Sequence, residues 1–124
     1  MFSTGIHRSV QINDTHVTKT ARNRIAIYCN KVEVERSGSS KYLARVIEFT
    51  PDYKIIKMEK VEIPSIRKRL AYSKILKHEL KGFSDVHWYN IGEKDGIPML
   101  YDYGDTFVLW HIVINKIKTV VING

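Results

Sequence analysis

The chain has little cysteine and proline, and it has no long hydrophobic run. Its 124 residues include one cysteine, Cys29, and three prolines. A single cysteine excludes an intramolecular disulfide, so nothing indicates an oxidising compartment. Residues 1–8 lack the apolar core of a signal peptide. The longest apolar run, from Phe107 to Ile114, is interrupted by His111 and is too short to cross a bilayer. We therefore expect a cytoplasmic protein without a membrane partner.

Standard catalytic motifs are also missing. The sequence contains no Gly-rich phosphate loop, no nucleophile elbow and no kinase motif set. Its five histidines have no zinc-ligand spacing, and no cysteine pair could complete a zinc site. The carboxylates near the turns at 93–95 and 102–105 match no metal-dependent nuclease pattern. We expect neither a metal nor a cofactor, and we favour a binding protein over an enzyme.

What the chain does have is a core-forming composition and a large positive charge. Hydrophobic residues make up 44% and charged residues 27%, which is typical of a globular protein. The length predicts one domain over residues 1–124 that buries a sizeable core. The net charge of +7 indicates a polyanionic partner, with nucleic acid as the leading class.

The positive charge is concentrated in two segments. Residues 1–32 carry +4 and residues 64–82 carry +5, whereas residues 33–63 are neutral and residues 83–124 carry −2. If the two basic segments adjoin in the fold, they form one positive face. The C-terminal third is mildly acidic and rich in aromatic residues, so we expect two chemically distinct surfaces.

Hydrophobic periodicity predicts an α+β fold with a largely antiparallel sheet. Alternating residues predict an N-terminal hairpin region of two strands around the turn at 37–40, followed by a third strand. A C-terminal meander is expected to follow. The predicted strands cover residues 32–35, 42–49, 54–63, 86–91, 98–103, 106–114 and 117–122.

Residues 14–29 allow two interpretations. Asp14 could cap a short helix over about 14–24, with a strand afterwards, and we prefer this interpretation. Alternatively, Ile25, Ile27 and Cys29 line one face of a strand that runs on toward residue 32.

The clearest element is a helix over about 65–81. Pro64 and Ser65 stand at its start and Gly82 at its end, as expected of helix boundaries. Its apolar residues are predicted on one side, and a basic group with His78 is predicted on another. The apolar set is Ile66, Leu70, Leu76 and Leu80, and the basic set is Arg67, Lys74, His78 and Lys81.

This basic helix is the leading candidate for a nucleic-acid-binding surface. Binding phosphates takes several cations on one surface, because the affinity comes from the release of many counterions. The alternative interpretation is a solvated helix face that keeps the protein soluble. The candidate nucleic-acid-binding residues are Arg67, Lys68, Lys74, His78, Lys81, Arg22 and Arg24.

Aromatic residues in the C-terminal third suggest a protein interface. Interfaces favour tyrosine and tryptophan, whereas the net negative charge of this segment argues against a nucleic-acid platform there. Packing in the core is the alternative interpretation. The candidate interface residues are Trp88, Tyr89, Tyr101 and Tyr103.

Three functions are consistent with these features. The first is binding of nucleic acid or a nucleic-acid-processing complex through the basic helix, and the second is a non-catalytic regulatory or inhibitory module that binds a larger protein. The third is a metal-independent ribonuclease with His78 as general base and nearby cations on the phosphate. A Val/Ile-rich strand at 117–122 could form a sheet edge that pairs in a homodimer.

The order of a basic helix followed by an antiparallel meander is loosely similar to that in small ribonuclease toxins of the RelE type. This resemblance covers the last half of the chain and includes no diagnostic motif of that family. The strands expected before the helix depart from its pattern. No catalytic residue is therefore transferred from it, and the catalytic residue remains unknown apart from His78.

Overall fold

A computed structural model describes residues 8–83 and 86–104 of the chain. Its helices and strands confirm the predicted α+β class, while the strands predicted at 106–114 and 117–122 lie outside the described residues. No helix within the described part is long and apolar enough to span a membrane. The elements in chain order are β1 (Arg8–Ile12), β2 (His16–Ala21), α1 (Arg24–Arg36), β3 (Val46–Phe49), β4 (Ile55–Glu59), α2 (Ile66–Glu79), the 3₁₀ helix η1 (Trp88–Asn90), β5 (Ile91–Lys94) and β6 (Ile97–Leu100).

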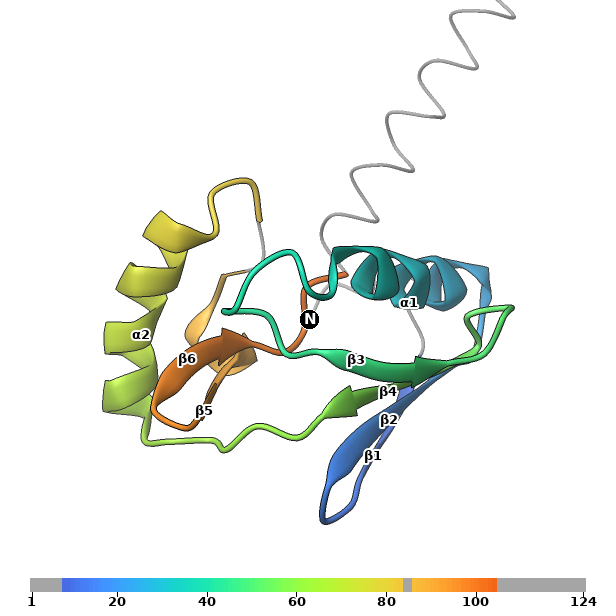
Figure 1. Ribbon diagram of the computed structural model, residues 1–124, viewed down its shortest axis with the longest axis horizontal. Helices are drawn as coiled ribbons and strands as arrows, with labels where there is room; N and C mark the ends of the chain where they lie inside the picture. The colour runs from blue at the N-terminus through green and yellow to red at the C-terminus, as the bar shows by residue number, and fades with distance from the viewer. Residues whose placement is uncertain (1–7, 84–85, 105–124) are drawn as a thin grey trace, which may run out of the picture.

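The larger sheet has four antiparallel strands in the order β1-β2-β4-β3, and α1 lies over one face of it (Figure 1). The β2–β4 register sets Val17 opposite Met58 and Lys19 opposite Ile56. Paired residues of neighbouring strands point to the same face. This face is buried at Lys19, Ile56 and Met58. The other face carries polar residues such as Thr18 and Lys57, which lie opposite each other.

A second layer consists of α2 and the β5–β6 hairpin. α2 packs against η1, β5 and β6, and it lies at one end of the longest dimension of the molecule (Figure 1). The main hydrophobic cluster lies where this layer meets the larger sheet, and Leu43, whose backbone bridges to Leu100, belongs to it. Leu76 of α2 and Ile91 of β5 are fully buried in the same cluster.

The structure contradicts the predicted helix over 14–24 and the strand after it, because the order of the two elements is reversed. Asp14 lies in the turn of a hairpin. In this turn the Asn13 side chain accepts hydrogen bonds from the backbone N–H groups of Thr15 and His16. β2 follows at once, and its β-branched residues favour a strand. The helix begins only after Asn23, whose side chain accepts a hydrogen bond from Ala26 N at 2.9 Å.

The predicted strand over 32–35 is helical instead, so the hairpin with 42–49 does not form. The alternation of Val32 and Val34 with Glu33 and Glu35 suggested a half-buried strand. In α1, however, both Glu33 and Val32 are buried. Glu33 can be buried because it pairs with Arg8 and Lys19. The second predicted strand is shortened to β3, which pairs with β4.

The helix over 65–81 is confirmed as α2, but its buried stripe differs from the prediction. Ser65 caps it by accepting a hydrogen bond from the third backbone N–H, and Gly82 follows it with a φ of 94°. Leu76 and Leu80 are buried as expected. Ile66 and Leu70 are 53% and 47% exposed, because α2 meets the rest of the protein along a stripe rotated away from them.

Residues 86–100 also differ in detail from the predicted strands. Three residues of the short strand expected at 86–91 form η1 instead, and of that range only Ile91 belongs to a strand, β5. β5 pairs with β6 around a tight turn at 95–96, where both residues have positive φ. The strand expected at 98–103 is β6, which ends at Leu100.

Candidate functional site

α2 presents a basic and partly apolar face to solvent. At about 100° per residue, the exposed positions occupy one side of the helix, opposite the buried Leu76. We call this side the α2 outer face. It consists of the α2 residues Ile66, Arg67, Leu70, Lys74, Lys77 and His78, together with Lys81, which follows the C-cap Leu80, and all of these residues are exposed.

The cations of the α2 outer face have no acidic partner within residues 8–83 and 86–104. No ion pair or side-chain hydrogen bond of the described part involves Arg67, Lys74, Lys77 or Lys81. The only carboxylate on the last turn of α2, Glu79, forms no ion pair there either. A cluster of uncompensated cations attracts anions, and phosphates suit it because each contact releases a counterion.

Lys68 lies on a different flank of the helix. Its Nζ is 2.9 Å from Glu93 Oε2, and the other oxygen of that carboxylate is 3.2 Å away. Tyr72 donates a hydrogen bond to the same carboxylate at 2.6 Å. Hydrogen bonds from Tyr72 and Lys68 lower the pKa of Glu93, and the bond to Glu93 raises the pKa of Lys68. Lys68 therefore fastens β5 to α2 and does not join the α2 outer face.

The second basic segment lies far from α2. Arg22 and Arg24 are exposed, and they adjoin the start of α1, at the opposite end of the longest dimension from α2 (Figure 1). Arg22 donates a hydrogen bond to Ser9 Oγ at 2.8 Å. The structure therefore does not bring the two basic segments together on one face.

Aromatic side chains adjoin α2 even though the sequence segment that carries them is acidic. The Arg69 guanidinium lies over the Trp88 ring, 5.1 Å from its centroid. Trp88 and Tyr89 are 36% and 53% exposed, and their rings meet edge to face at 5.8 Å. The ring of His87 stacks on Tyr89 at 5.1 Å. This set of three rings is called the η1 aromatic cluster.

The other two predicted interface tyrosines have structural roles. Tyr103 is 2% exposed and donates a hydrogen bond to Ala44 O. Burial and the Glu33 charge raise its pKa. The structure thus places Tyr103 in the core, out of reach of a partner. Tyr101 is half-buried, and its hydroxyl donates a hydrogen bond to Tyr89 O at 2.5 Å, so it supports η1.

The structure places His78, the candidate general base, at an exposed position of α2. It is exposed on the α2 outer face, and no hydrogen bond joins it to another residue of the described part. General-base catalysis depends on a positioned imidazole, and no hydrogen bond among the described residues positions this ring. Within the same residues, no group of three or more histidine, cysteine or acidic side chains is placed to hold a metal ion.

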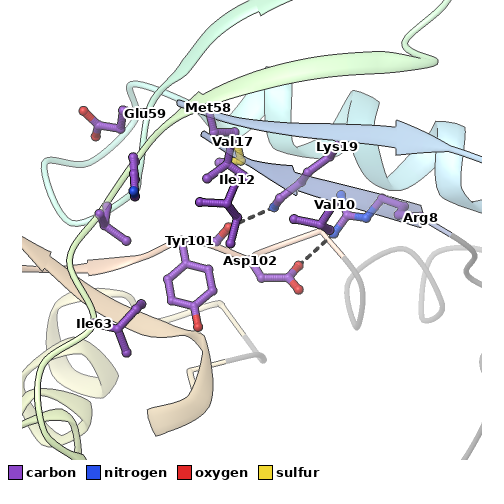
Figure 2. Close-up of a pocket in the computed structure, with 12 residues that line it drawn as sticks. Arg8, Val10, Ile12, Val17, Lys19, Met58, Glu59, Ile63, Tyr101 and Asp102 are labelled. Carbon is purple, nitrogen blue, oxygen red and sulfur yellow. Dashed lines mark hydrogen bonds and ion pairs between the residues drawn. The ribbon is translucent and has the colours of Figure 1, made fainter. Parts of the chain in front are cut away.

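A cleft of about 450 Å³ opens on the face of the larger sheet, beyond the edge of α1 (Figure 2). Its walls are mainly apolar, with Val10 and Ile12 of β1 facing Ile63 and Tyr101. The polar end carries Arg8, Lys19 and Asp102. In the described part, no buried side-chain nitrogen or oxygen lacks a hydrogen-bond partner, so no unsatisfied polar group is aimed at a ligand.

The polar end of this cleft belongs to a buried ion cluster. Glu33 is fully buried and lies 2.7 Å from Arg8 Nη1 and 3.1 Å from Lys19 Nζ. Arg8 also binds Asp102 at 2.9 Å, and Tyr103 N donates to Glu33 at 3.0 Å. Burial raises the pKa of Glu33, but the charges of Arg8 and Lys19 and the Tyr103 hydrogen bond outweigh it and lower the pKa to about 2. The cluster ties β1, β2, α1 and residues 101–103 together.

Sequence reasoning missed this ion cluster and the contact between Arg69 and Trp88. The one sequence signal for the cluster is that Glu33, a charged residue, lies on the apolar stripe of a helix. Periodicity alone assigned residues 32–35 to a strand, so this signal was not visible. Comparison of the chain with protein-family models, curated proteins and solved structures finds no match. The function is therefore inferred from the α2 outer face and its surroundings.

Proposed function

We propose that the protein binds nucleic acid through the α2 outer face. The observation that carries this proposal is the group of four exposed cations, Arg67, Lys74, Lys77 and Lys81, without an acidic partner among the described residues. In contrast, the buried cations Arg8 and Lys19 are matched by carboxylates.

The expected binding is electrostatic and therefore sensitive to salt. If the four cations each contact one phosphate of a single strand, the logarithm of the affinity should fall with the logarithm of salt with a slope of about −3. Fluorescence anisotropy of a labelled oligonucleotide, titrated between about 50 and about 300 mM salt, measures this slope. A flat response would contradict the proposal.

A pair of charge reversals locates the binding surface. Lys74→Glu with Lys81→Glu should weaken binding by roughly tenfold to hundredfold at low salt, because two phosphate contacts become repulsive. The matched control is Arg24→Glu with Lys31→Glu on α1, which changes the net charge equally and has the same seven-residue spacing. The control should bind nearly like the wild type, and equal losses in both variants would mean that binding follows the net charge and has no defined surface.

A second candidate function is docking on a larger protein with an acidic surface. It is favoured by the exposed apolar side chains Ile66 and Leu70 on α2, which packs against η1 with its exposed Trp88 and Tyr89. Interfaces combine aliphatic and aromatic contacts with a polar rim. Affinity capture with the full chain, before and after nuclease treatment, separates the two functions. A partner that survives nuclease and is lost in Ile66→Asp or Leu70→Asp would support this second function.

A further inference from the structure

We infer that the η1 aromatic cluster makes the α2 outer face specific for single-stranded nucleic acid, by stacking Trp88 and Tyr89 against unpaired bases. This inference rests on the proposed function. It follows from the position of η1, the rigidity of the cluster and the charge around it.

The aromatic cluster is continuous with the α2 outer face. η1 packs directly against α2, with Trp88 under the guanidinium of Arg69. On a helical projection Arg69 is followed by Ile66, Lys77 and Leu70, and then by Lys74 and Arg67. The surface therefore continues from the exposed rings to a stretch that mixes aliphatic side chains with a lysine, and it ends in cations. An extended strand has bases on one side and phosphates on the other, and this order of surfaces matches both.

The rings are held in place before any ligand binds. Tyr101 donates hydrogen bonds to the carbonyls of Tyr89 and Asn90, through its hydroxyl and its backbone N–H. Asn90 N donates to His87 O at 2.9 Å, which closes the turn of η1. The stacking of His87 on Tyr89 fixes that ring further. A preorganised ring loses little conformational entropy on binding, so a stacked base contributes more to affinity.

The acidic character of the C-terminal third does not reach these rings in the described part. Glu93 is neutralised by Lys68 on the flank of α2 that meets β5. Asp102 pairs with Arg8 in the buried ion cluster. Among the described residues, Arg69 places its cationic guanidinium over the Trp88 ring. Two described carboxylates of this segment are thus compensated, which weakens the objection that the sequence raised against a nucleic-acid platform here.

Stacking distinguishes single strands from duplexes. Bases in a duplex are stacked on one another and expose only their edges, whereas unpaired bases offer a planar face to an aromatic ring. The α2 cations alone would bind the phosphates of either form. We therefore expect a single strand of about 12 nucleotides to bind roughly tenfold more tightly than the duplex of the same sequence, at equal salt.

The test measures both forms with ring-removing and ring-keeping variants of the full chain. Trp88→Ala and Tyr89→Ala should each weaken single-strand binding by about fivefold to tenfold and leave duplex binding within about twofold. Trp88→Phe and Tyr89→Phe keep a ring and should retain most of the affinity. Phe49→Ala is the matched control, because Phe49 is 51% exposed on β3 and is distant from α2 in the fold.

A spectroscopic measurement reports on the stacking directly. The chain has two tryptophans, so Trp110→Phe leaves Trp88 as the only one. Its fluorescence should be quenched by a single-stranded oligonucleotide and remain nearly constant with the duplex. This readout stays informative if an alanine variant proves unstable.

The outcomes separate this inference from the proposed function. Equal, salt-sensitive binding of both forms with no effect of the ring removals overturns the stacking inference and leaves nucleic-acid binding intact. Absence of binding to either form overturns both. Binding of an acidic protein alone, with neither oligonucleotide bound, also overturns both and favours the docking function.

Discussion

Two regions of the molecule use their charges in opposite ways. Around β1, β2 and α1, Arg8 and Lys19 are buried and bound to Glu33 and Asp102. On α2, the cations of the outer face are exposed and have no acidic partner among the described residues. A buried charge must be paired, since its desolvation costs several kcal/mol, whereas an exposed cation is free to bind an external anion. The first set of charges therefore serves the fold, and the second is available for a ligand.

The comparison also shows why net charge alone says little about function. Arg8, Lys19, Arg22 and Arg24 all belong to the basic N-terminal segment. Arg8 and Lys19 form ion pairs in the buried cluster. Arg22 and Arg24 adjoin the start of α1, at the end of the molecule opposite α2 (Figure 1). The functional charge is the part that remains uncompensated on one surface.

The largest effect should come from breaking the buried ion cluster. Glu33→Gln leaves Arg8 and Lys19 buried without a counter-charge, so it should lower the free energy of unfolding by about 3–5 kcal/mol. Urea denaturation followed by circular dichroism measures this loss. The matched control is Glu35→Gln on the exposed side of α1, whose pairing distance to Lys31 is 4.0 Å, and it should change stability by less than about 0.5 kcal/mol.

Acid should weaken the same cluster. The pKa of Glu33 is lowered to about 2 in the folded state from an ordinary value of 4.5. Its contribution is therefore complete above the unfolded-state pKa and is lost as the pH falls through the folded-state pKa. We expect the wild type to lose stability between pH 4.5 and 2, and Glu33→Gln to lose less over that range. Parallel pH profiles for both proteins would contradict this assignment.

Charge reversal on α2 should have the opposite pattern. Lys74→Glu with Lys81→Glu weakens nucleic-acid binding strongly under the proposed function, but it should change the free energy of unfolding by less than about 0.5 kcal/mol. The reason is that neither lysine has an ion pair to lose within the described residues. Urea denaturation of the binding-deficient variant checks this separation, and a large loss of stability would mean that the α2 lysines serve the fold.

The smallest effect should come from Lys68, which belongs to α2 but not to its outer face. Lys68→Ala removes the ion pair to Glu93, so stability should fall only slightly, because Lys68 is half exposed and solvent screens the pair. Oligonucleotide affinity should fall less than in Arg67→Ala, which removes one phosphate contact and lowers the salt slope by about 0.7 for a single strand. Equal slopes for the two variants would place Lys68 in the binding surface.

Parts of this structure could be predicted from local sequence signals. The α+β class and the helix α2 follow from periodicity and from boundary residues, since Ser65 and Gly82 act within one turn of the helix ends. The reversed assignment around Asn23 shows the limit of the same method. Asp14 and Asn23 are both good caps by residue type, and only pairing of β2 with β1 and β4 decides which one begins a helix.

By itself, the sequence determined the fold class, the position of α2, the concentration of cations along it, and the absence of a disulfide. These properties depend on residue types and short spacings. Only the tertiary structure decided that Glu33 is buried, that Lys68 is engaged by Glu93, and that Trp88 lies beside Arg69. The contacts of Glu33 with Arg8, of Lys68 with Glu93 and of Arg69 with Trp88 each join residues at least 19 positions apart. Side-chain pairing over such separations leaves no local periodicity in the sequence.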